Sequence, residues 1–312
     1  MAAKSQAQRS RVLVVTGKGG VGKTACATAI GLALAQRGNR VLVAEINGGG
    51  SVAQMLGTSP VGSQVREICP DFSVVDINPT SALREYALLT LRVEAIYRTV
   101  FDNRWVRRFL RLVPSLGELV MLGKIWYHAQ EQLAGCPRFD AIVVDAPATG
   151  HAMALLRAPL AAAEAVPAGP LRSNALLIQE LLGDPERTKI HIVTTPEEMP
   201  VSEAIELADS IHSLGLSLGR PLINQRIPPL PSAAWEALGE DGDQDPCLRR
   251  CRESLRAREA KRIAGERHLR RLPQDFRDAI SLPRLITPTF GHKELRELAR
   301  THLLPWVTEQ SL

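Results

Sequence analysis

The sequence GKGGVGKT, residues 17–24, decides the fold because of what lies on either side of it. The apolar run RVLVVT before it has the composition of a buried β-strand, and KTACATAIGLALAQRG has the pattern of an amphipathic helix that ends at Gly38. The four glycines of the quoted stretch favour a tight turn that larger residues would obstruct. A strand, a glycine-rich turn and a helix in this order predict the start of an α/β domain.

The same stretch satisfies the P-loop pattern, in which backbone N–H groups and a helix N-terminus surround phosphate groups. In this pattern Lys23 reaches the β- and γ-phosphates of a nucleotide, and Thr24 binds Mg²⁺. The residues expected to hold the nucleotide are Gly17, Gly19, Gly20, Val21, Gly22, Lys23, Thr24 and Ala25. The sequence therefore predicts a site for ATP and Mg²⁺.

Both basic residues of this loop are lysines, although the chain contains 31 arginines and only seven lysines. A compact ammonium group fits under a glycine loop closed on phosphates, where a planar guanidinium would not, and this explains Lys23. The simple P-loop pattern gives no role to Lys18.

The composition predicts one large domain with a sizeable core, since 45% of the 312 residues are hydrophobic. No apolar run is long enough for a signal sequence or a membrane span, so we expect a cytoplasmic protein without direct membrane insertion. The five cysteines are scattered and odd in number, and we expect thiols rather than a disulfide framework.

Valine- and isoleucine-rich runs alternate with helical segments, which predicts a parallel sheet covered on both faces. The expected strands are 11–15, 41–46, 72–77, 141–146, 190–195, 221–225 and 284–288. The long interval 79–132 has helical spacing throughout and is interpreted as a helical subdomain inserted between two strands. We predict a single α/β P-loop domain over 11–304, with a doubly wound, mostly parallel sheet of about seven or eight strands and flexible tails at 1–10 and 305–312.

GKGGVGKT resembles the deviant P-loop of the MinD/ParA/ArsA group of ATPases. In that group the early lysine marks dimerisation. The resemblance implies that Lys18 crosses a homodimer interface and brings positive charge to the nucleotide of the other subunit.

Two further segments resemble the ArsA and tail-anchored-protein-targeting ATPases within this group. AIVVDAPATGHAMALLRAP, residues 141–159, looks like their switch II segment, which implies that Asp145 holds Mg²⁺ through water. VTTPEEMPVSEAIELADSIHSLGLSLGRPLINQR, residues 193–226, resembles their strand, helix and strand that end in an adenine-reading asparagine, here Asn224. The resemblance covers the chain from about Arg11 to Leu304.

The first switch segment departs from this family. In VLVAEINGGGSVAQMLG, residues 41–57, Asn47 occupies the position of the aspartate that orients the attacking water. Asparagine can hold a water molecule but cannot accept its proton as a carboxylate does. Either hydrolysis is slow and the protein is a nucleotide-gated switch, or Glu45, about 6–7 Å away on the same strand face, or another group takes over. Because phosphoryl transfer relies on positioning and electrostatics, we favour hydrolysis and assign it to Lys18, Lys23, Asn47 and Asp145.

The cysteine pair in DPCLRRC, residues 245–251, lies at a predicted helix start, with Asp245 as N-cap and Pro246 in the first position. The targeting ATPases bind zinc with a pair separated by two residues, whereas three residues separate Cys247 from Cys251. A Zn²⁺ site shared across a dimer is one alternative, and we expect two unliganded thiols instead.

Several biological roles stay open at this point. The favoured one is an ArsA-like ATPase whose homodimer opens and closes to handle a client or membrane partner protein. The cysteine count opposes an arsenite pump, and Met121 as the single methionine of 79–132 opposes a methionine-rich groove for tail-anchored proteins. In a ParA- or MinD-like positioning protein, the basic stretch 249–271 would bind DNA, or a terminal helix would bind a membrane. We expect this stretch to be a solvated surface instead, and no nucleic acid partner.

Overall fold

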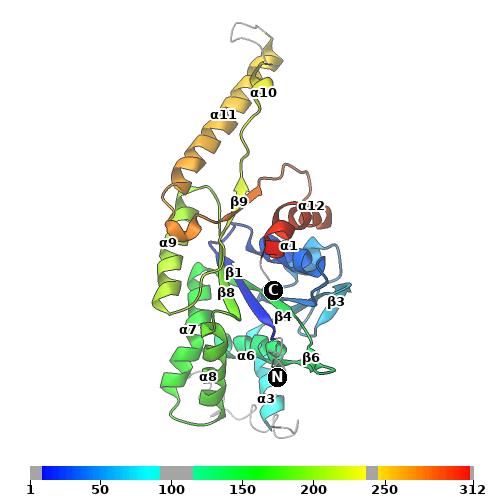
Figure 1. Ribbon diagram of the computed structural model, residues 1–312, viewed down its shortest axis with the longest axis vertical. Coiled ribbons are helices and arrows are strands. Elements are labelled where there is room, and N and C mark those ends of the chain that lie inside the picture. Colours follow the sequence, from blue (N-terminus) through cyan, green and yellow to red (C-terminus); the bar gives the residue numbers. More distant parts are fainter. Residues whose placement is uncertain (1–8, 92–114, 237–244, 310–312) are drawn as a thin grey trace, which may run out of the picture.

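The computed structural model describes residues 9–91, 115–236 and 245–309, and a central β-sheet dominates it (Figure 1). The strands of this sheet are β1 (Arg11–Gly17), β2 (Val41–Ile46), β3 (Arg66–Cys69), β4 (Phe72–Ile77), β7 (Ala141–Ala148), β8 (Thr188–Thr194), β9 (Leu222–Arg226) and β10 (Ile280–Pro283). Their spatial order is β10-β9-β8-β1-β7-β2-β4-β3. Neighbours run parallel except for the edge strand β3, which is antiparallel to β4. The predicted α/β class and mostly parallel sheet are confirmed.

Helices cover both faces of the sheet, because successive residues of each strand point to opposite sides. On one face lie α1 (Lys23–Ala35), α2 (Ser51–Met55), α12 (His292–Leu298), the π-helical segment η2 (Ala299–Leu303) and α13 (Leu304–Glu309). On the other lie α6 (Leu116–Gln130), α7 (Thr149–Ala165), α8 (Pro170–Gly183) and α9 (Glu198–Ser213). In β1, Leu13 and Val15 join the first cluster, whereas Val12 and Val14 join the second. The sheet is therefore doubly wound.

The segment between β4 and β7 is helical where the structure describes it. It contains α3 (Pro79–Leu91) and α6, which pack against each other, and a two-stranded ribbon of β5 (Gln132–Leu133) and β6 (Cys136–Pro137). Residues 92–114 of the predicted insert lie outside the described residues. Helices α7 and α8, which follow β7, pack with α6 below the sheet in Figure 1, so the helical layer extends beyond the insert.

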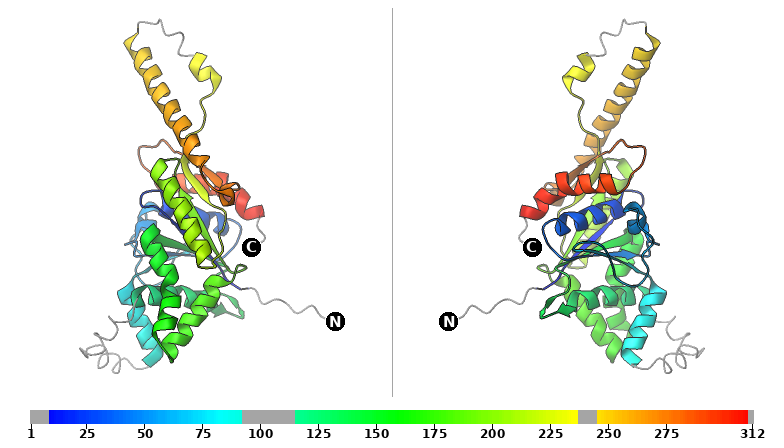
Figure 2. Two further views of the ribbon diagram at one scale, coloured as in Figure 1. Left: turned by 90° about the vertical axis from the view of Figure 1, so that its left-hand side faces the viewer. Right: turned by 90° about the vertical axis from the view of Figure 1, so that its right-hand side faces the viewer.

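A long helix, α11 (Pro246–Leu269), projects from the domain together with α10 (Ser232–Glu236), as both views of Figure 2 show. A 3₁₀ turn, η1 (Gln274–Phe276), then leads back to the sheet. Only Arg252 and Gly265 of α11 are buried, so most of this helix faces solvent. Among the described residues, no helix combines the length and apolar composition needed to cross a bilayer.

The C-terminal part of the chain differs from the sequence-based expectations. The last strand is Ile280–Pro283, not 284–288, because Ile280 and Ser281 pair with β9 while the exposed Ile286 lies beyond the sheet. Residues up to 309 form α13, where Trp306 and Val307 are buried against the sheet layer and do not form a flexible tail. At the other end, Ser10 is buried and donates to the carbonyl of Phe139, while residues 1–8 lie outside the described residues.

Candidate functional site

The P-loop connects the carboxyl end of β1 to the N-terminus of α1, in the centre of the sheet where β7 and β8 flank β1. Two of its glycines leave no room for a side chain. A Cβ atom on Gly17 would lie 2.1 Å from the carbonyl oxygen of Val193, and one on Gly22 would lie 2.4 Å from Asn224 Nδ2. Both glycines also have positive φ angles, 150° and 89°. The loop is therefore packed tightly against the ends of β8 and β9.

Lys23 is the first residue of α1, and its ammonium group turns back over the loop to donate to the carbonyl of Lys18 at 3.2 Å. Burial lowers the pKa of Lys23, while the nearby carboxylate of Asp145 opposes that shift. The loop thus combines free helix N–H groups with a partly desolvated positive charge, an arrangement that attracts phosphate.

Three carboxylates form a row at the carboxyl ends of adjacent strands. Asp145 on β7 is in register with Glu45 on β2, which in turn is in register with Asp76 on β4. Residues paired in parallel strands point to the same face of the sheet. The row therefore brings three acidic groups together on the side of Thr24 and Lys23, both of which act on Asp145.

Desolvation dominates the electrostatics of this row. The pKa of Asp145 is raised to about 6, mainly by burial and also by the charge of Glu45, while the hydrogen bond from Thr24 opposes the shift. Burial also raises the pKa of Glu45 and of Asp76. Each of the three carboxyl groups has one buried oxygen without a hydrogen-bond partner among the described residues.

The unpaired oxygen of Asp145, beside Thr24, fits a cation. Mg²⁺ prefers oxygen ligands and commonly takes only one or two from the protein, completing its shell with water and substrate phosphates. Thr24 offers its hydroxyl directly, and Asp145 is placed to hold a water ligand because it contacts Thr24. The residues present therefore suit the predicted Mg²⁺, whose charge would offset the cost of burying Asp145.

Lys18 has a partner within its own chain. Its ammonium group forms an ion pair with Glu203 of α9, and the other oxygen of Glu203 accepts from the hydroxyl of Thr149, 3.3 Å away. Thr149 follows β7 and begins α7, in the segment that resembles switch II. Glu203 thus connects the P-loop lysine to that segment, and nothing in the local sequence around Glu203 signals this role.

Asn47 and Glu45 are two residues apart in the sequence, but one is exposed and the other is buried. Asn47 is exposed at the end of β2, with a left-handed φ angle of 53°. Glu45 is buried, and its Oε1 accepts from the backbone N–H of Ser51 at 2.8 Å, at the start of α2. One oxygen of Glu45 therefore stabilises the turn that carries Asn47, while the other faces the carboxylate row.

Asn224, in the middle of β9, lies against the P-loop. Its Nδ2 donates to the carbonyl of Val21 at 2.8 Å, and its Oδ1 accepts from the backbone N–H of Gln225 at 2.9 Å. One N–H and one lone pair of this amide remain for a ligand. The residue is next to the nucleotide loop, and its adenine-reading role stays a prediction.

Cys247 and Cys251 lie far from this site, near the start of α11, and both are exposed. The predicted cap is present: the backbone N–H of Cys247 donates to Asp245 Oδ1 at 2.8 Å, and Pro246 opens the helix. In the described part of the chain, no group of three or more His, Cys, Asp or Glu side chains is arranged to hold a metal. The zinc alternative would need ligands from a second chain.

Comparison with known proteins identifies the family. The family model of the anion-transporting ATPases, the ArsA type, matches residues 10–167, just over half of the chain. The chain belongs to this family of ATPases. The matched region of this ArsA-family chain runs from the P-loop through the carboxylate row to the end of α7.

Curated relatives agree with this assignment. ATPase BagA of Mycobacterium tuberculosis is 31% identical over 229 residues, 70% of this chain and 66% of that protein. An arsenical pump-driving ATPase of Acidiphilium multivorum is 27% identical over 255 residues, covering 72% of this chain and 42% of its own length. ATPase GET3B of Arabidopsis thaliana is 24% identical over 274 residues. The chain thus spans slightly less than two thirds of the first of these relatives.

Proposed function

We propose that this ArsA-family chain binds ATP with Mg²⁺ and hydrolyses it, working as a nucleotide-gated homodimer. The observation that carries the proposal is the unpaired oxygen of Asp145 beside Thr24 and Lys23, at the mouth of a complete P-loop. A buried carboxylate without a partner costs free energy, and a nucleotide-bound cation offsets that cost.

Each residue of the site has a distinct task in this proposal. The loop N–H groups and Lys23 hold the phosphates, Thr24 and Asp145 hold Mg²⁺, and Asn224 contacts the base. When bound, Mg²⁺ supplies charge that stabilises the phosphates as the γ-phosphoryl group leaves. Because phosphoryl transfer depends mainly on such positioning and charge, these residues account for most of the expected catalysis.

Asn47 sets the expected rate. Its amide can orient a water molecule but cannot take a proton, and it is exposed at the edge of the site. Glu45 is a carboxylate close to Asp145, but one of its oxygens is engaged by Ser51. We therefore propose slow hydrolysis with Asn47 positioning the water, and a nucleotide-gated switch as the second candidate function.

The dimeric part of the proposal gives Lys18 its role. When two chains meet across their nucleotides, Lys18 leaves Glu203 and contacts the phosphates of the partner subunit. Once Lys18 has left, Glu203 can shift together with Thr149, which donates to its other oxygen, and this shift transmits the change to α7 and the neighbouring helices. We propose that this movement handles a client or a partner protein in the cytoplasm, with no requirement for nucleic acid.

The experiment is a steady-state ATPase measurement combined with the mass of the protein in solution, with and without ATP and Mg²⁺. We expect Lys23→Ala to abolish nucleotide binding, Lys18→Ala to abolish ATP-dependent dimerisation, and Asn47→Asp to raise turnover. Lys189→Ala, an exposed lysine on β8, is the matched control and leaves each quantity unchanged.

Each part of the proposal can fail separately. Absence of ATP binding by the unmodified chain contradicts the nucleotide site itself. A Lys18→Ala variant that dimerises and turns over normally contradicts the trans role of this lysine. Turnover that Asn47→Asp leaves unchanged, but Glu45→Gln abolishes, assigns the attacking water to Glu45 in place of Asn47.

A further inference from the structure

A cavity of about 600 Å³ lies among the helices beside the sheet, apart from the P-loop. Residues of α3, α6 and α8 line it, together with the segment that precedes β3. Much of its wall is apolar and aromatic and includes Tyr86, Trp126 and Ile178. Its size and lining are those of sites that take small organic molecules.

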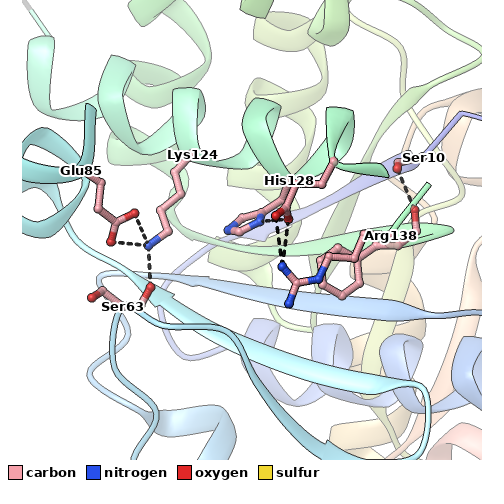
Figure 3. A network of polar contacts seen from close by, with 8 residues as sticks. Ser10, Ser63, Glu85, Lys124, His128 and Arg138 are labelled. Carbon is pink, nitrogen blue, oxygen red and sulfur yellow. Dashed lines mark hydrogen bonds and ion pairs between the residues drawn. The ribbon is translucent and has the colours of Figure 1, made fainter. Parts of the chain in front are cut away.

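The polar part of the wall forms two groups along α6, shown in Figure 3. In the first, the ammonium group of Lys124 pairs with Glu85 at 2.8 Å and donates to the carbonyl of Ser63 at 2.5 Å. In the second, Glu131 lies between Arg138 and His128, at 3.0 Å from the arginine Nη1 and 2.7 Å from the histidine Nδ1. Lys124 and His128 are both more than nine-tenths buried.

Among the described residues of the lining, the charges cancel. Two positive residues, Lys124 and Arg138, are matched by Glu85 and Glu131, and each of these four side chains is already in an ion pair. A charged ligand would have to break one of these pairs, in which Lys124 and Glu131 are the partners that are largely withdrawn from water, with 7% and 18% of their side chains exposed. The lining therefore favours a ligand without net charge.

His128 supplies the polar contact that is still open. A hydrogen on Nδ1 can be donated to the carboxylate of Glu131, and burial lowers the pKa of the ring, which favours its neutral form. The other nitrogen, Nε2, is then an acceptor, and it is buried without a hydrogen-bond partner among the described residues. A buried acceptor of this kind gains free energy from a ligand that donates to it.

We propose that this cavity binds an uncharged small molecule with an aromatic body and one hydroxyl or N–H group, which donates to His128 Nε2. Aromatic rings of the ligand pack against Trp126 and Tyr86, and the ligand leaves the two ion pairs intact. This site shares no residue with the P-loop, so the proposal does not depend on ATP binding or hydrolysis.

Three probes of one shape test the ligand class: 2-naphthol, which has a hydroxyl donor, naphthalene, which has none, and 2-naphthoate, which is charged. Binding to the full chain is measured by equilibrium dialysis. Gly123→Leu fills the cavity, because a Cβ at Gly123 on α6 meets only Ile178 Cδ1, at 3.8 Å. Gly123→Ala is its matched control, and His128→Phe removes the acceptor while keeping a ring.

We expect saturable binding of one 2-naphthol per chain, weaker by tenfold or more in Gly123→Leu and unchanged in Gly123→Ala. In His128→Phe, loss of one buried hydrogen bond should lower the affinity for 2-naphthol by about tenfold. The affinity for naphthalene should stay within about twofold of its value in the unmodified chain. Failure of 2-naphthol to saturate overturns the site. Equal effects of His128→Phe on both neutral probes overturn the hydrogen bond, and tighter binding of 2-naphthoate overturns the uncharged class. If Gly123→Leu does not fold, the comparison of 2-naphthol and naphthalene binding in His128→Phe tests the site by itself.

Discussion

At the scale of single residues, the two lysines of the P-loop differ in what they contact. Lys23 lies over its own loop, whereas Lys18 pairs with Glu203, about 29% of each side chain being exposed. An ion pair that solvent reaches in this way contributes little to stability, typically below about 1 kcal/mol. Its main consequence is to occupy Lys18, which in the proposed dimer leaves Glu203 to reach the second subunit.

We therefore expect Glu203→Gln to promote dimerisation. Without the carboxylate, Lys18 is released at no electrostatic cost, so dimers form at lower ATP concentration while the free energy of unfolding changes by less than about 1 kcal/mol. Light scattering across an ATP titration measures the ATP concentration at the midpoint of dimer formation. Glu206→Gln, an exposed glutamate on the same helix, should leave that midpoint unchanged. An identical midpoint in both variants contradicts the role of Glu203.

Burying the carboxylate of Asp145 has a free-energy cost that the proposed Mg²⁺ would offset. Because its pKa is raised from 3.8 to about 6, its ionised form destabilises the fold at pH values above 6. That cost is fully present at pH 8 and disappears as pH falls through 6 toward 3.8, where the group is protonated in both states.

Asp145→Asn should accordingly stabilise the nucleotide-free protein at pH 8 by up to about 3 kcal/mol, and much less at pH 4.5. The same change should abolish the stabilisation that Mg²⁺ with ATP gives the unmodified protein. Urea unfolding at both pH values measures these differences. Asp209→Asn, on the exposed face of α9, is the control. A variant that is less stable at pH 8 contradicts the assignment of an unpaired charge.

At the scale of elements, α1 packs close enough to the sheet to require a glycine. A Cβ atom on Gly31 would lie 2.7 Å from Val43 Cγ2 and 2.9 Å from a ring carbon of Phe72. This contact fixes the distance between α1 and strands β2 and β4, and with it the position of the P-loop at the N-terminus of α1.

Gly31→Ala should therefore destabilise the protein by about 1–3 kcal/mol, although alanine has the higher helix propensity. In Gly123→Ala on α6, where the new methyl group meets only Ile178 at 3.8 Å, propensity should dominate and the protein should gain up to about 1 kcal/mol. Chemical unfolding of both variants gives the comparison. If both variants gain the same free energy of unfolding, α1 does not need its close approach to strands β2 and β4.

The elements that the sequence predicted best are those whose pattern is complete within a few residues. Runs such as VLVAEI and AIVVDA are buried on both faces, and their composition alone indicates central strands. Strand β3 has mixed burial at the antiparallel edge, so it carries no such signal. In the RLITP run, the backbone N–H of Arg284 still donates to the carbonyl of Arg226 on β9, but no residue after Arg284 pairs with a strand among the described residues, so β10 ends at Pro283.

At the scale of the whole molecule, His191 joins the sheet to the C-terminal helix. Its ring is completely buried on β8, packs edge-on against Trp306 of α13 at 5.4 Å between centroids, and hydrogen-bonds the carbonyl of Arg220 at 2.9 Å. This contact explains why residues 304–309 pack as a helix against the domain, since Trp306 completes the cover of the sheet.

Burial lowers the pKa of His191 to about 4, so its neutral form belongs to the folded state. As pH falls from 6.5 to 4, the unfolded chain takes up a proton that the folded protein does not, and about 3 kcal/mol of stability is lost. His191→Phe should lack this part of the acid destabilisation. The free energy of unfolding is measured at pH 7 and pH 4.5 for the unmodified protein and for His191→Phe. If both proteins lose the same stability between these pH values, the buried neutral ring is contradicted.

The sequence by itself determined the P-loop, the central strands and the family, because these depend on residues close together in the chain. The row formed by Asp145, Glu45 and Asp76, the partner of Lys18, and the cavity beside His128 were decided only by the tertiary structure. Strand order brings the three carboxylates into register, and helix packing leaves the cavity open. Such contacts join residues tens of positions or more apart, and local composition does not encode which strands become neighbours.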